Sequence, residues 1–340
     1  MENKQEKMTA AALGTLKYIF NPTPADKVLV ISDTYSQNIA SAFGEALEQF
    51  HCFTENFLIA DSLRPLKEIP AELENLLPEK TIVLNIMRSI PEEIPFRIKW
   101  IFRVEENIKI RMGHMPGITE DMMLNSVNVD FSRMSLSAER LKMGLENADE
   151  LHITTPEGTD IKLGIRDRKF TSDIGLKEGE MCNIPCGEIY CAPVETEAEG
   201  VIVFNASIGD IGLLKSPLKV FVHEGRITHF ESEDNDLVRR ITLLSEVDEE
   251  AKVIGELGIG LNPGARITGN MLEDEKALFT AHIAFGNNED FPGGKNKSRI
   301  HRDYLFFRPT IEVKYKNGNK KYLIKDGSII QLEFKPILDF

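Results

Sequence analysis

The chain has 340 residues, of which 42% are hydrophobic and 28% are charged, as is usual for a globular protein of about two domains. Its formal net charge of −14 at pH 7 argues against nucleic acid or an anionic membrane as a partner, because phosphate groups are bound by Lys and Arg. The N-terminal residues lack the apolar core of a signal peptide, and no run approaches the roughly 18 apolar residues of a membrane span. We therefore expect a cytoplasmic protein.

Strand-like and helical patterns alternate over residues 9–113. Continuous apolar runs of strand length begin at Lys27, Asn56, Thr81 and Asn107, with helical stretches between them. Runs that are apolar on both faces are typical of a parallel sheet covered by helices on both sides. The pattern predicts an α/β fold with a flavodoxin-like or Rossmann-like N-terminal sheet. It contains neither G-x-G-x-x-G nor G-x-x-x-x-G-K-[ST], which argues against a nucleotide site.

Two polar residues of this half allow two interpretations each. Asp33 ends the first predicted strand, where it could contact a ligand, although such residues more often cap the next helix. His114 could line a cleft, but a structural histidine with a hydrogen-bond partner is the simpler interpretation.

Beyond residue 147 the signals turn to short strands. A hairpin is predicted around residues 156–158, and the last predicted strand covers residues 329–334. We predict two domains: an α/β scaffold at residues 1–147, and a metal-binding catalytic domain at residues 148–340 that is α+β and largely antiparallel.

Four residues of the second domain have the chemistry of metal ligands. Glu256, His282, His301 and Asp303 lie within or beside short apolar or glycine-rich runs, where a charged side chain is costly unless something binds it. His301 and Asp303 are two residues apart, so in a strand both point to one face. Mixed imidazole and carboxylate ligands suit zinc, cobalt, manganese or ferrous iron, and a two-metal hydrolytic site is one option. A buried histidine bonded to a nearby aspartate is the alternative.

Three of the four cysteines cluster in this domain. Cys182, Cys186 and Cys191 surround Glu188, whereas Cys52 stands alone. The C-x3-C-x4-C spacing lacks the C-x2-C pair of a structural zinc site. Small buried residues beside a metal centre are therefore the simpler interpretation.

The sequence resembles the aminopeptidase T family of thermophilic metallo-aminopeptidases, the leucyl aminopeptidases of peptidase family M29. The resemblance covers nearly the whole chain, in the expected order. It rests on NIPCGEIYCAPVETEAEGVIVFN from Asn183, GELGIGLNPGA from Gly255, LEDEKALFTAHIAFG from Leu272, GGKNKSRIHRD ending at Asp303 and, more weakly, RMGHMPGITEDMM from Arg111.

The resemblance implies a two-metal active site in the second domain. It assigns the metal ligands to five positions: Glu188, Glu256, His282, His301 and Asp303. It also implies two divalent ions (zinc, cobalt or manganese), a short peptide as substrate, and a homodimer. Glu256 is our candidate for the catalytic carboxylate nearest the attacking water.

The chain departs from the family at one catalytic position. The family's active-site tyrosine falls on Glu289, which has no phenol to polarise a carbonyl. Tyr190 and Tyr304 are the candidates to replace it. Glu275, in the charged run EDEK, is most simply part of a solvated helix turn, with a role behind the metal ligands as the alternative.

Three functional hypotheses follow. The first is a metal-dependent aminopeptidase that releases N-terminal amino acids from short peptides through a water activated by two metals. The second is a ring-cleaving dioxygenase of dihydroxypyridines, since such enzymes resemble these peptidases; they hold one ferrous ion and have a histidine where this chain has Glu256. The third is a relative that binds metal or a small molecule without catalysis.

Overall fold

The structure, a computed structural model, describes residues 3–330 and divides them into two compact units. Unit 1 contains residues 3–135, 173–187 and 262–266. Unit 2 contains residues 136–172, 188–261 and 267–330. Whether residues 1–147 and 148–340 form two separately folding domains stays a prediction.

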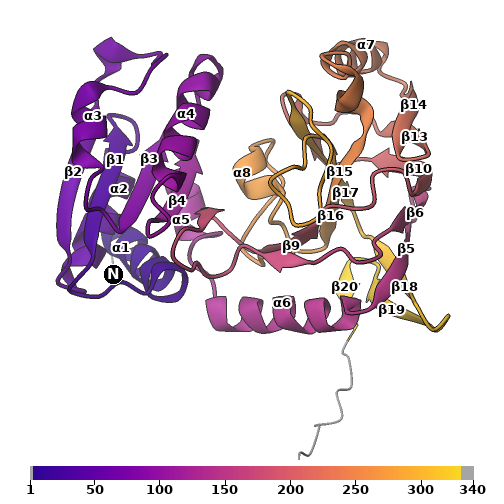
Figure 1. Ribbon diagram of the computed structural model, residues 1–340, viewed down its shortest axis with the longest axis horizontal. Coiled ribbons are helices and arrows are strands. Elements are labelled where there is room, and N and C mark those ends of the chain that lie inside the picture. Colours follow the sequence, from indigo (N-terminus) through magenta and orange to yellow (C-terminus); the bar gives the residue numbers. More distant parts are fainter. Residues whose placement is uncertain (1–2, 331–340) are drawn as a thin grey trace, which may run out of the picture. The chain divides into compact units, whose positions relative to one another are not determined.

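Unit 1 is built on a parallel sheet with the strand order β2-β1-β3-β4-β8 (Figure 1). Helices connect β1 to β2, β2 to β3 and β3 to β4, as parallel pairing requires, whereas β8 follows a segment of unit 2. The predicted parallel-sheet domain is confirmed. Its strands are β1 Lys27–Asp33, β2 Phe53–Ile59, β3 Ile82–Met87, β4 Arg111–Pro116 and β8 Met181–Asn183. Its helices are α1 Lys4–Thr15, α2 Gln37–Glu48, α3 Ala71–Leu76, α4 Ile94–Glu105 and α5 Glu120–Leu124, with a π-helical turn at Leu16–Phe20 and short 3-10 turns at Asp61–Leu63 and Pro91–Glu93.

The strand predicted to start at Asn107 begins at Arg111 instead. The amide of Lys109 bonds the Asn107 side chain at 3.2 Å, and the amide of Ile110 bonds the Asn107 carbonyl at 3.0 Å. Asn107 thus closes a turn on its own side chain, a local alternative to the sheet that hydrophobicity does not reveal.

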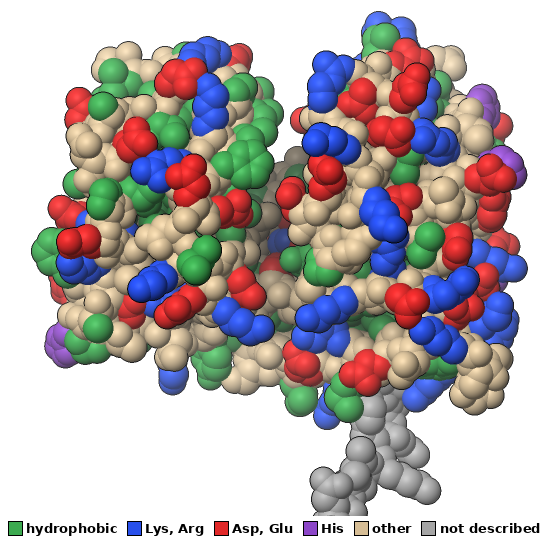
Figure 2. All heavy atoms as spheres, viewed as in Figure 1, with side chains coloured by type: hydrophobic (Ala, Val, Ile, Leu, Met, Phe, Trp, Pro, Cys, Tyr) green, Lys and Arg blue, Asp and Glu red, His purple; other side chains and the backbone are tan. Residues whose placement is uncertain are grey.

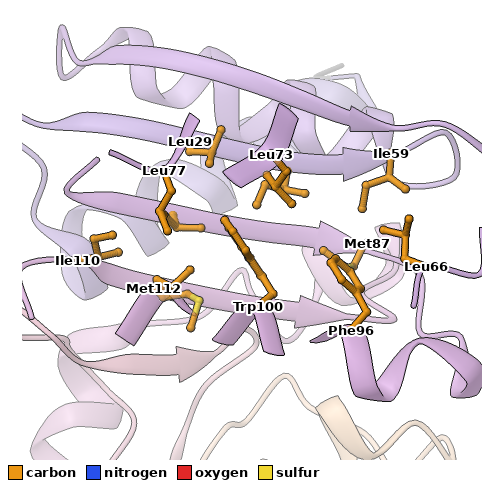
Figure 3. Close-up of a cluster of buried hydrophobic side chains, with 13 residues drawn as sticks. Leu29, Ile59, Leu66, Leu73, Leu77, Met87, Phe96, Trp100, Ile110 and Met112 are labelled. Carbon is orange, nitrogen blue, oxygen red and sulfur yellow. The ribbon is translucent and has the colours of Figure 1, made fainter. Parts of the chain in front are cut away.

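A buried apolar cluster fills one side of this sheet (Figure 3). Trp100 of α4, 1% exposed, crosses it and contributes the largest fully buried side chain of the described chain. Its indole Nε1 donates to Oδ1 of Asn85 at 2.9 Å, and the Asn85 amide in turn lies 3.3 Å from Nδ1 of His114. His114 is 7% exposed and bonded, so the structural interpretation of this histidine is confirmed.

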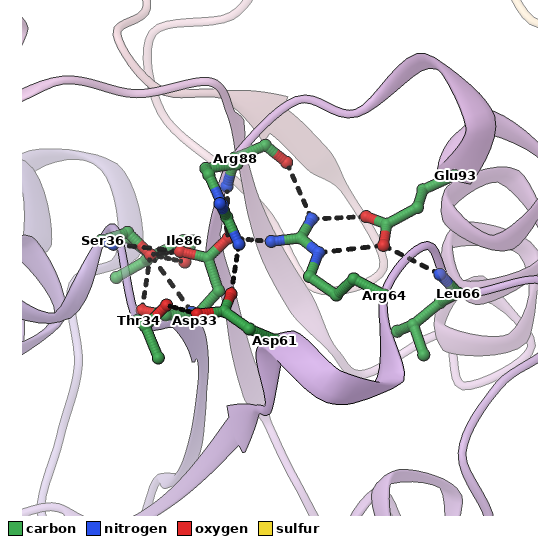
Figure 4. A network of polar contacts seen from close by, with 9 residues as sticks. All are labelled: Asp33, Thr34, Ser36, Asp61, Arg64, Leu66, Ile86, Arg88 and Glu93. Atoms are coloured by element: carbon green, nitrogen blue, oxygen red, sulfur yellow. Dashed lines mark hydrogen bonds and ion pairs between the residues drawn. The ribbon is translucent and has the colours of Figure 1, made fainter.

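A network of buried charges lies at the carboxyl end of β1 (Figure 4). Asp33 accepts hydrogen bonds from the backbone amides of Ser36 (3.0 Å) and Arg88 (2.9 Å), and it pairs with Arg64. Arg64 also forms an ion pair with Glu93, and Nε of Arg64 lies 2.9 Å from Oε1 of Glu93. Asp33 therefore holds the turn before α2, although the N-cap of that helix is Ser36 and not Asp33.

Unit 2 contains two antiparallel sheets, as predicted (Figure 1). One has the order β14-β13-β10-β6-β5-β18-β19-β20, and the other has β12-β11-β17-β16-β15-β9-β7. The strands are β5 Ala148–Thr154, β6 Asp160–Gly164, β7 Thr171–Ser172, β9 Glu188–Cys191, β10 Ala198–Phe204, β11 Ser207–Ile208, β12 Gly212–Leu213, β13 Leu218–His223, β14 Arg226–Glu231, β15 Ile254–Gly260, β16 Thr280–Gly286, β17 His301–Phe307, β18 Thr310–Tyr315, β19 Lys320–Lys325 and β20 Ser328–Ile329. The helices are α7 Asn235–Leu244 and α8 Met271–Asp274, a 3-10 turn spans Glu249–Lys252, and α6 Phe131–Leu145 runs from unit 1 into unit 2.

Aromatic side chains join the two sheets of unit 2. Phe204 of β10 lies 5.1 Å from Tyr304 and 5.9 Å from Phe306 of β17, between ring centroids. Because side chains alternate along a strand, His301 and Asp303 of β17 project from the opposite face. The seven-stranded sheet thus has one face in the aromatic core and one face that carries polar ligands.

The strand predicted at residues 329–334 lies mostly outside the described residues. Within residues 3–330, no helix combines the length and the apolar character needed to cross a bilayer. On the face shown in Figure 2, Lys and Arg side chains are interspersed with Asp and Glu.

Removing Arg64 should destabilise unit 1 strongly, because buried Glu93 would lose its ion pair and buried Asp33 would lose one of its two arginine partners and keep Arg88. We expect Arg64→Met to lower the free energy of unfolding by about 3–5 kcal/mol. Trp100 is the single tryptophan, so its fluorescence during chemical denaturation reports unit 1.

Arg103→Met is the matched control, since Arg103 pairs with Glu74 and Glu106 at the surface. We expect Arg103→Met to lower the free energy of unfolding by less than about 1 kcal/mol. Equal unfolding midpoints for the two variants would contradict a stabilising role of the buried network.

Candidate metal centre

The five predicted ligands converge on one face of the seven-stranded sheet. Glu188 starts β9, Glu256 lies in β15, His282 lies in β16, and His301 and Asp303 lie in β17. The four strands are consecutive neighbours in the sheet. Register and alternation therefore bring all five side chains to the same side.

A bulge at Gly255 sets the orientation of Glu256. Ile254 pairs with Phe285 of β16 and Glu256 pairs with Ala284, so β15 has one extra residue between them. The bulge puts Glu256 in a row with Ala284 and, one strand further, Asp303. The side chain of Ala284 is a single methyl group, so there is room for an ion between the carboxylates of Glu256 and Asp303.

Gly258 leaves the corresponding room for His282. It lies between Tyr190 of β9 and His282 of β16. A Cβ on this glycine would come within 2.1 Å of the imidazole ring of His282. Any side chain at this position would push the ring out of its place.

The ligand atoms form two groups that share Glu256. In the first, Nε2 of His282 lies 3.5 Å from Oε2 of Glu188 and 3.5 Å from Oε1 of Glu256. In the second, Nε2 of His301 lies 2.9 Å from Oε2 of Glu256 and 3.4 Å from Oδ1 of Asp303. One carboxylate thus presents an oxygen to each group.

The loop after β16 orients His301. Its Nδ1 lies 2.8 Å from the carbonyl oxygen of Asn287, so Nδ1–H donates there and Nε2 is directed at the second group. Phe291 packs edge-on against the same ring, with centroids 5.5 Å apart. His301 lies at the rim of the centre, with 31% of its side chain exposed, whereas His282 is 1% exposed.

The residues fit a divalent cation. Oδ1 of Asp303 is buried and has no hydrogen-bond partner within residues 3–330; its neighbour is the ring nitrogen of His301 at 3.4 Å. A buried carboxylate oxygen in that position is costly unless a cation satisfies it. Three carboxylates and two imidazoles are a donor set for zinc, cobalt, manganese or iron.

In the metal-free chain, protons supply the missing positive charge. Burial favours the neutral imidazole of His282, but the hydrogen bond to Glu256 and the charge of Glu188 outweigh it and raise the pKa of His282 to about 9. Burial acts likewise on His301, and Asp303 and Glu256 raise the pKa of His301 well above its usual value. Burial raises the pKa of Glu256, but its bonds to the two histidines lower that pKa overall.

Lys276 is a buried component of the centre that sequence reasoning did not single out. It follows α8, is 2% exposed, and pairs with Glu188 and with Oε1 of Glu275 at 2.8 Å. The side chain of Glu275 is 12% exposed, and Glu273 and Asp274 are buried, so the prediction that Glu275 is part of a solvated turn is wrong. The signal was present in the resemblance of this run to the family motif, but composition alone favoured solvent.

Other predicted residues lie away from the two groups. Neither of these groups, which are drawn from residues 3–330, contains a cysteine. Glu289 is exposed, and its Oε2 lies 3.7 Å from Nζ of Lys297. Tyr304 faces the aromatic core of unit 2, whereas Tyr190 shares the sheet face of Glu188 and packs on Phe291, with centroids 5.3 Å apart.

Gly258→Ala should disrupt the first group, because the new methyl group displaces the buried ring of His282. We expect divalent-ion affinity, measured by isothermal titration calorimetry, to fall at least about tenfold. Gly44→Ala is the control, since a Cβ there meets nothing within 4 Å. Wild-type affinity in Gly258→Ala would mean that His282 is not a ligand.

Metal binding should release protons, because a metal takes only the neutral imidazole and the pKa of His282 is raised to about 9. At pH 7 we expect at least about one proton released per chain, and an affinity that rises with pH from about 6.5 toward 9. Calorimetry at pH 7 in buffers of different ionisation enthalpy measures the release. Binding heats that do not depend on the buffer would contradict the protonated metal-free state.

Comparisons with known proteins give a family and a shared fold. The family model described as thermophilic metalloprotease (M29) matches residues 131–329. Wild-type AmpT from Thermus thermophilus has a similar structure, with a TM-score of 0.75 and 16% identity over 97% of this chain and 100% of that one. So does 2,5-dihydroxypyridine dioxygenase from Pseudomonas putida KT2440, with a TM-score of 0.75 and 17% identity over 96% and 97% of the two chains.

The two structural likenesses show a shared fold, because both identities are low. No curated protein sequence matches the chain significantly. The family match covers more than half of the 340 residues and includes all five convergent ligand positions. The chain therefore belongs to the M29 family of thermophilic metalloproteases.

Proposed function

We propose that this metallopeptidase-family protein is an aminopeptidase that removes N-terminal amino acids from short peptides with two divalent metal ions. The observation that carries the proposal is the position of Glu256, whose two oxygens face the two ligand groups. A carboxylate shared in this way supports a pair of ions rather than a single one. Membership of the M29 family supports peptide hydrolysis.

The proposal assigns each ligand to an ion. Glu188, Glu256 and His282 would hold one ion, and Glu256, His301 and Asp303 would hold the other. When bound, zinc, cobalt or manganese ions lower the pKa of a bound water and polarise a carbonyl group.

The chain's own groups supply positioning and hydrogen bonds. Glu256 is the catalytic carboxylate of the proposal, because it lies between the groups and is nearest to a water that both would share. His301 is held by its bond to the Asn287 carbonyl, which keeps Nε2 directed at the centre. Tyr190, on the same sheet face, is the hydroxyl that we propose to bond the developing oxyanion, since Glu289 cannot donate.

The fold shared with a dioxygenase defines the second candidate function. A ring-cleaving dioxygenase would use about one ferrous ion held by two histidines and a carboxylate. Glu188 and Glu256 give this centre more carboxylates than that site needs, which favours hydrolysis. A non-catalytic metal-binding protein is the third candidate.

Metal analysis and a peptidase assay test the proposal together. Purified protein should contain about two zinc, cobalt or manganese ions per chain, and it should release amino acids from aminoacyl-p-nitroanilides and dipeptides. About one iron per chain with no hydrolysis would favour the dioxygenase. If protein that is shown to contain metal hydrolyses none of these substrates, a binding role would be favoured.

Glu256→Gln should lower kcat/KM at least about a thousandfold, because a bridging carboxylate is lost while the shape is kept. Glu231→Gln is the matched control, since Glu231 lies at the surface of β14. Equal rates for the two variants would remove Glu256 from the mechanism.

Location and assembly complete the proposal. We infer a cytoplasmic homodimer, in which enclosed active sites would restrict substrates to short peptides. The scaffold and catalytic domains are assigned to residues 1–147 and 148–340.

A further inference from the structure

Lys276 is an ammonium group buried beside the first ligand group. It is 2% exposed, and its Nζ pairs with Oε1 of Glu188 and, at 2.8 Å, with Oε1 of Glu275. Moving an ammonium ion out of water is costly, and a buried ion pair is often no more stable than an apolar replacement. Fold stability alone is therefore a weak reason for a lysine at this position.

The two oxygens of Glu188 have different surroundings. Oε1 pairs with Lys276, whereas Oε2 lies 3.5 Å from Nε2 of His282, inside the ligand group. A carboxylate on a two-torsion side chain can rotate, and the bond to Lys276 fixes one oxygen away from the group. The other oxygen is thereby directed into it.

Glu275 holds Lys276 from a second side. Neither Lys276 nor Glu275 belongs to either ligand group. Glu188 belongs to the first group and not to the second. If Lys276 acts through Glu188, its effect should therefore be largest for an ion held by the group that contains Glu188.

We propose that Lys276 is a positioning residue that orients Glu188 to offer one oxygen to a divalent ion at the Glu188–Glu256–His282 group, with Glu275 holding the lysine in place. The proposal rests on the two-ion function proposed above. It concerns how this chain prepares the ion site that contains Glu188.

A second physical effect has the opposite sign. An ammonium group repels a divalent cation, so a lysine that acted only through its charge would weaken metal binding. Glu275 offsets that charge at 2.8 Å, and the repulsion is reduced accordingly. We therefore expect the loss of orientation to dominate when Lys276 is removed.

The test is calorimetric titration of metal-free protein with Mn²⁺ or Zn²⁺. Wild type should bind two ions. In Lys276→Met, one of the two should bind about 10–100-fold more weakly while the other stays near its wild-type affinity. Glu275→Gln, which changes no volume, should weaken the same ion in the same direction. Lys320→Met, at an exposed pair with Glu312, is the control and should change neither.

A double-mutant cycle identifies the route of the effect. If Lys276 acts through Glu188, then Lys276→Met should have little further effect on affinity in a Glu188→Gln background. The ion that remains tightly bound in Lys276→Met shows that the variant is folded, and circular dichroism checks Glu275→Gln independently.

Three outcomes would overturn the inference. Unchanged or tighter binding of both ions in Lys276→Met and Glu275→Gln would show that orientation does not matter. Equal weakening of both ions would show a general structural effect. A full effect of Lys276→Met in the Glu188→Gln background would show that Lys276 acts elsewhere. Wild-type protein that binds no divalent ion would refute the proposed function itself.

Discussion

Negative charge buried on one sheet face is the constraint on which the rest of this centre depends. Glu188, Glu256 and Asp303 are each at most 8% exposed, and carboxylates at such depth are unstable unless cations or donors surround them. Several features of the local structure accommodate these carboxylates. Gly258 makes space for an imidazole, Ala284 keeps two carboxylates apart, and their neighbours provide charge-assisted bonds.

The charge count describes how the proposed centre could hold either protons or metal ions. The three ligand carboxylates carry three negative charges, and two protonated imidazoles reduce the total to one negative charge. Two divalent ions in place of the protons would leave one positive charge, which suits a hydroxide or another bound anion. Lys276 and Glu275 balance one another beside this set. Proton and metal thus compete for the same positions.

Much of this arrangement could be predicted from sequence. The parallel and antiparallel sheets follow from apolar runs and alternation, and the H-x-D pair of β17 follows from strand periodicity. Glu188 lies 68 residues before Glu256 in the chain, and only the resemblance to a family linked the two. Burial of Lys276 was not predictable, because a run of four charged residues is typical of a solvated surface. Tertiary packing, which the run itself does not reveal, encloses Lys276. The register that gives Tyr190 and Tyr304 opposite surroundings is likewise a property of long-range pairing.

The bulge at Gly255 has a consequence for how this strand can change over time. Successive side chains of a strand point to opposite faces, so removal of Leu257 from the regular part of β15 would exchange the faces of the strand residues that follow it. Ile259 would then occupy the polar face, and Gly258 would lose its place beside His282, whereas removal of the extra residue Gly255 would leave Glu256 paired with Ala284. Single-residue insertions and deletions should therefore be excluded from the part of the strand that follows Glu256 in descendants that keep the centre.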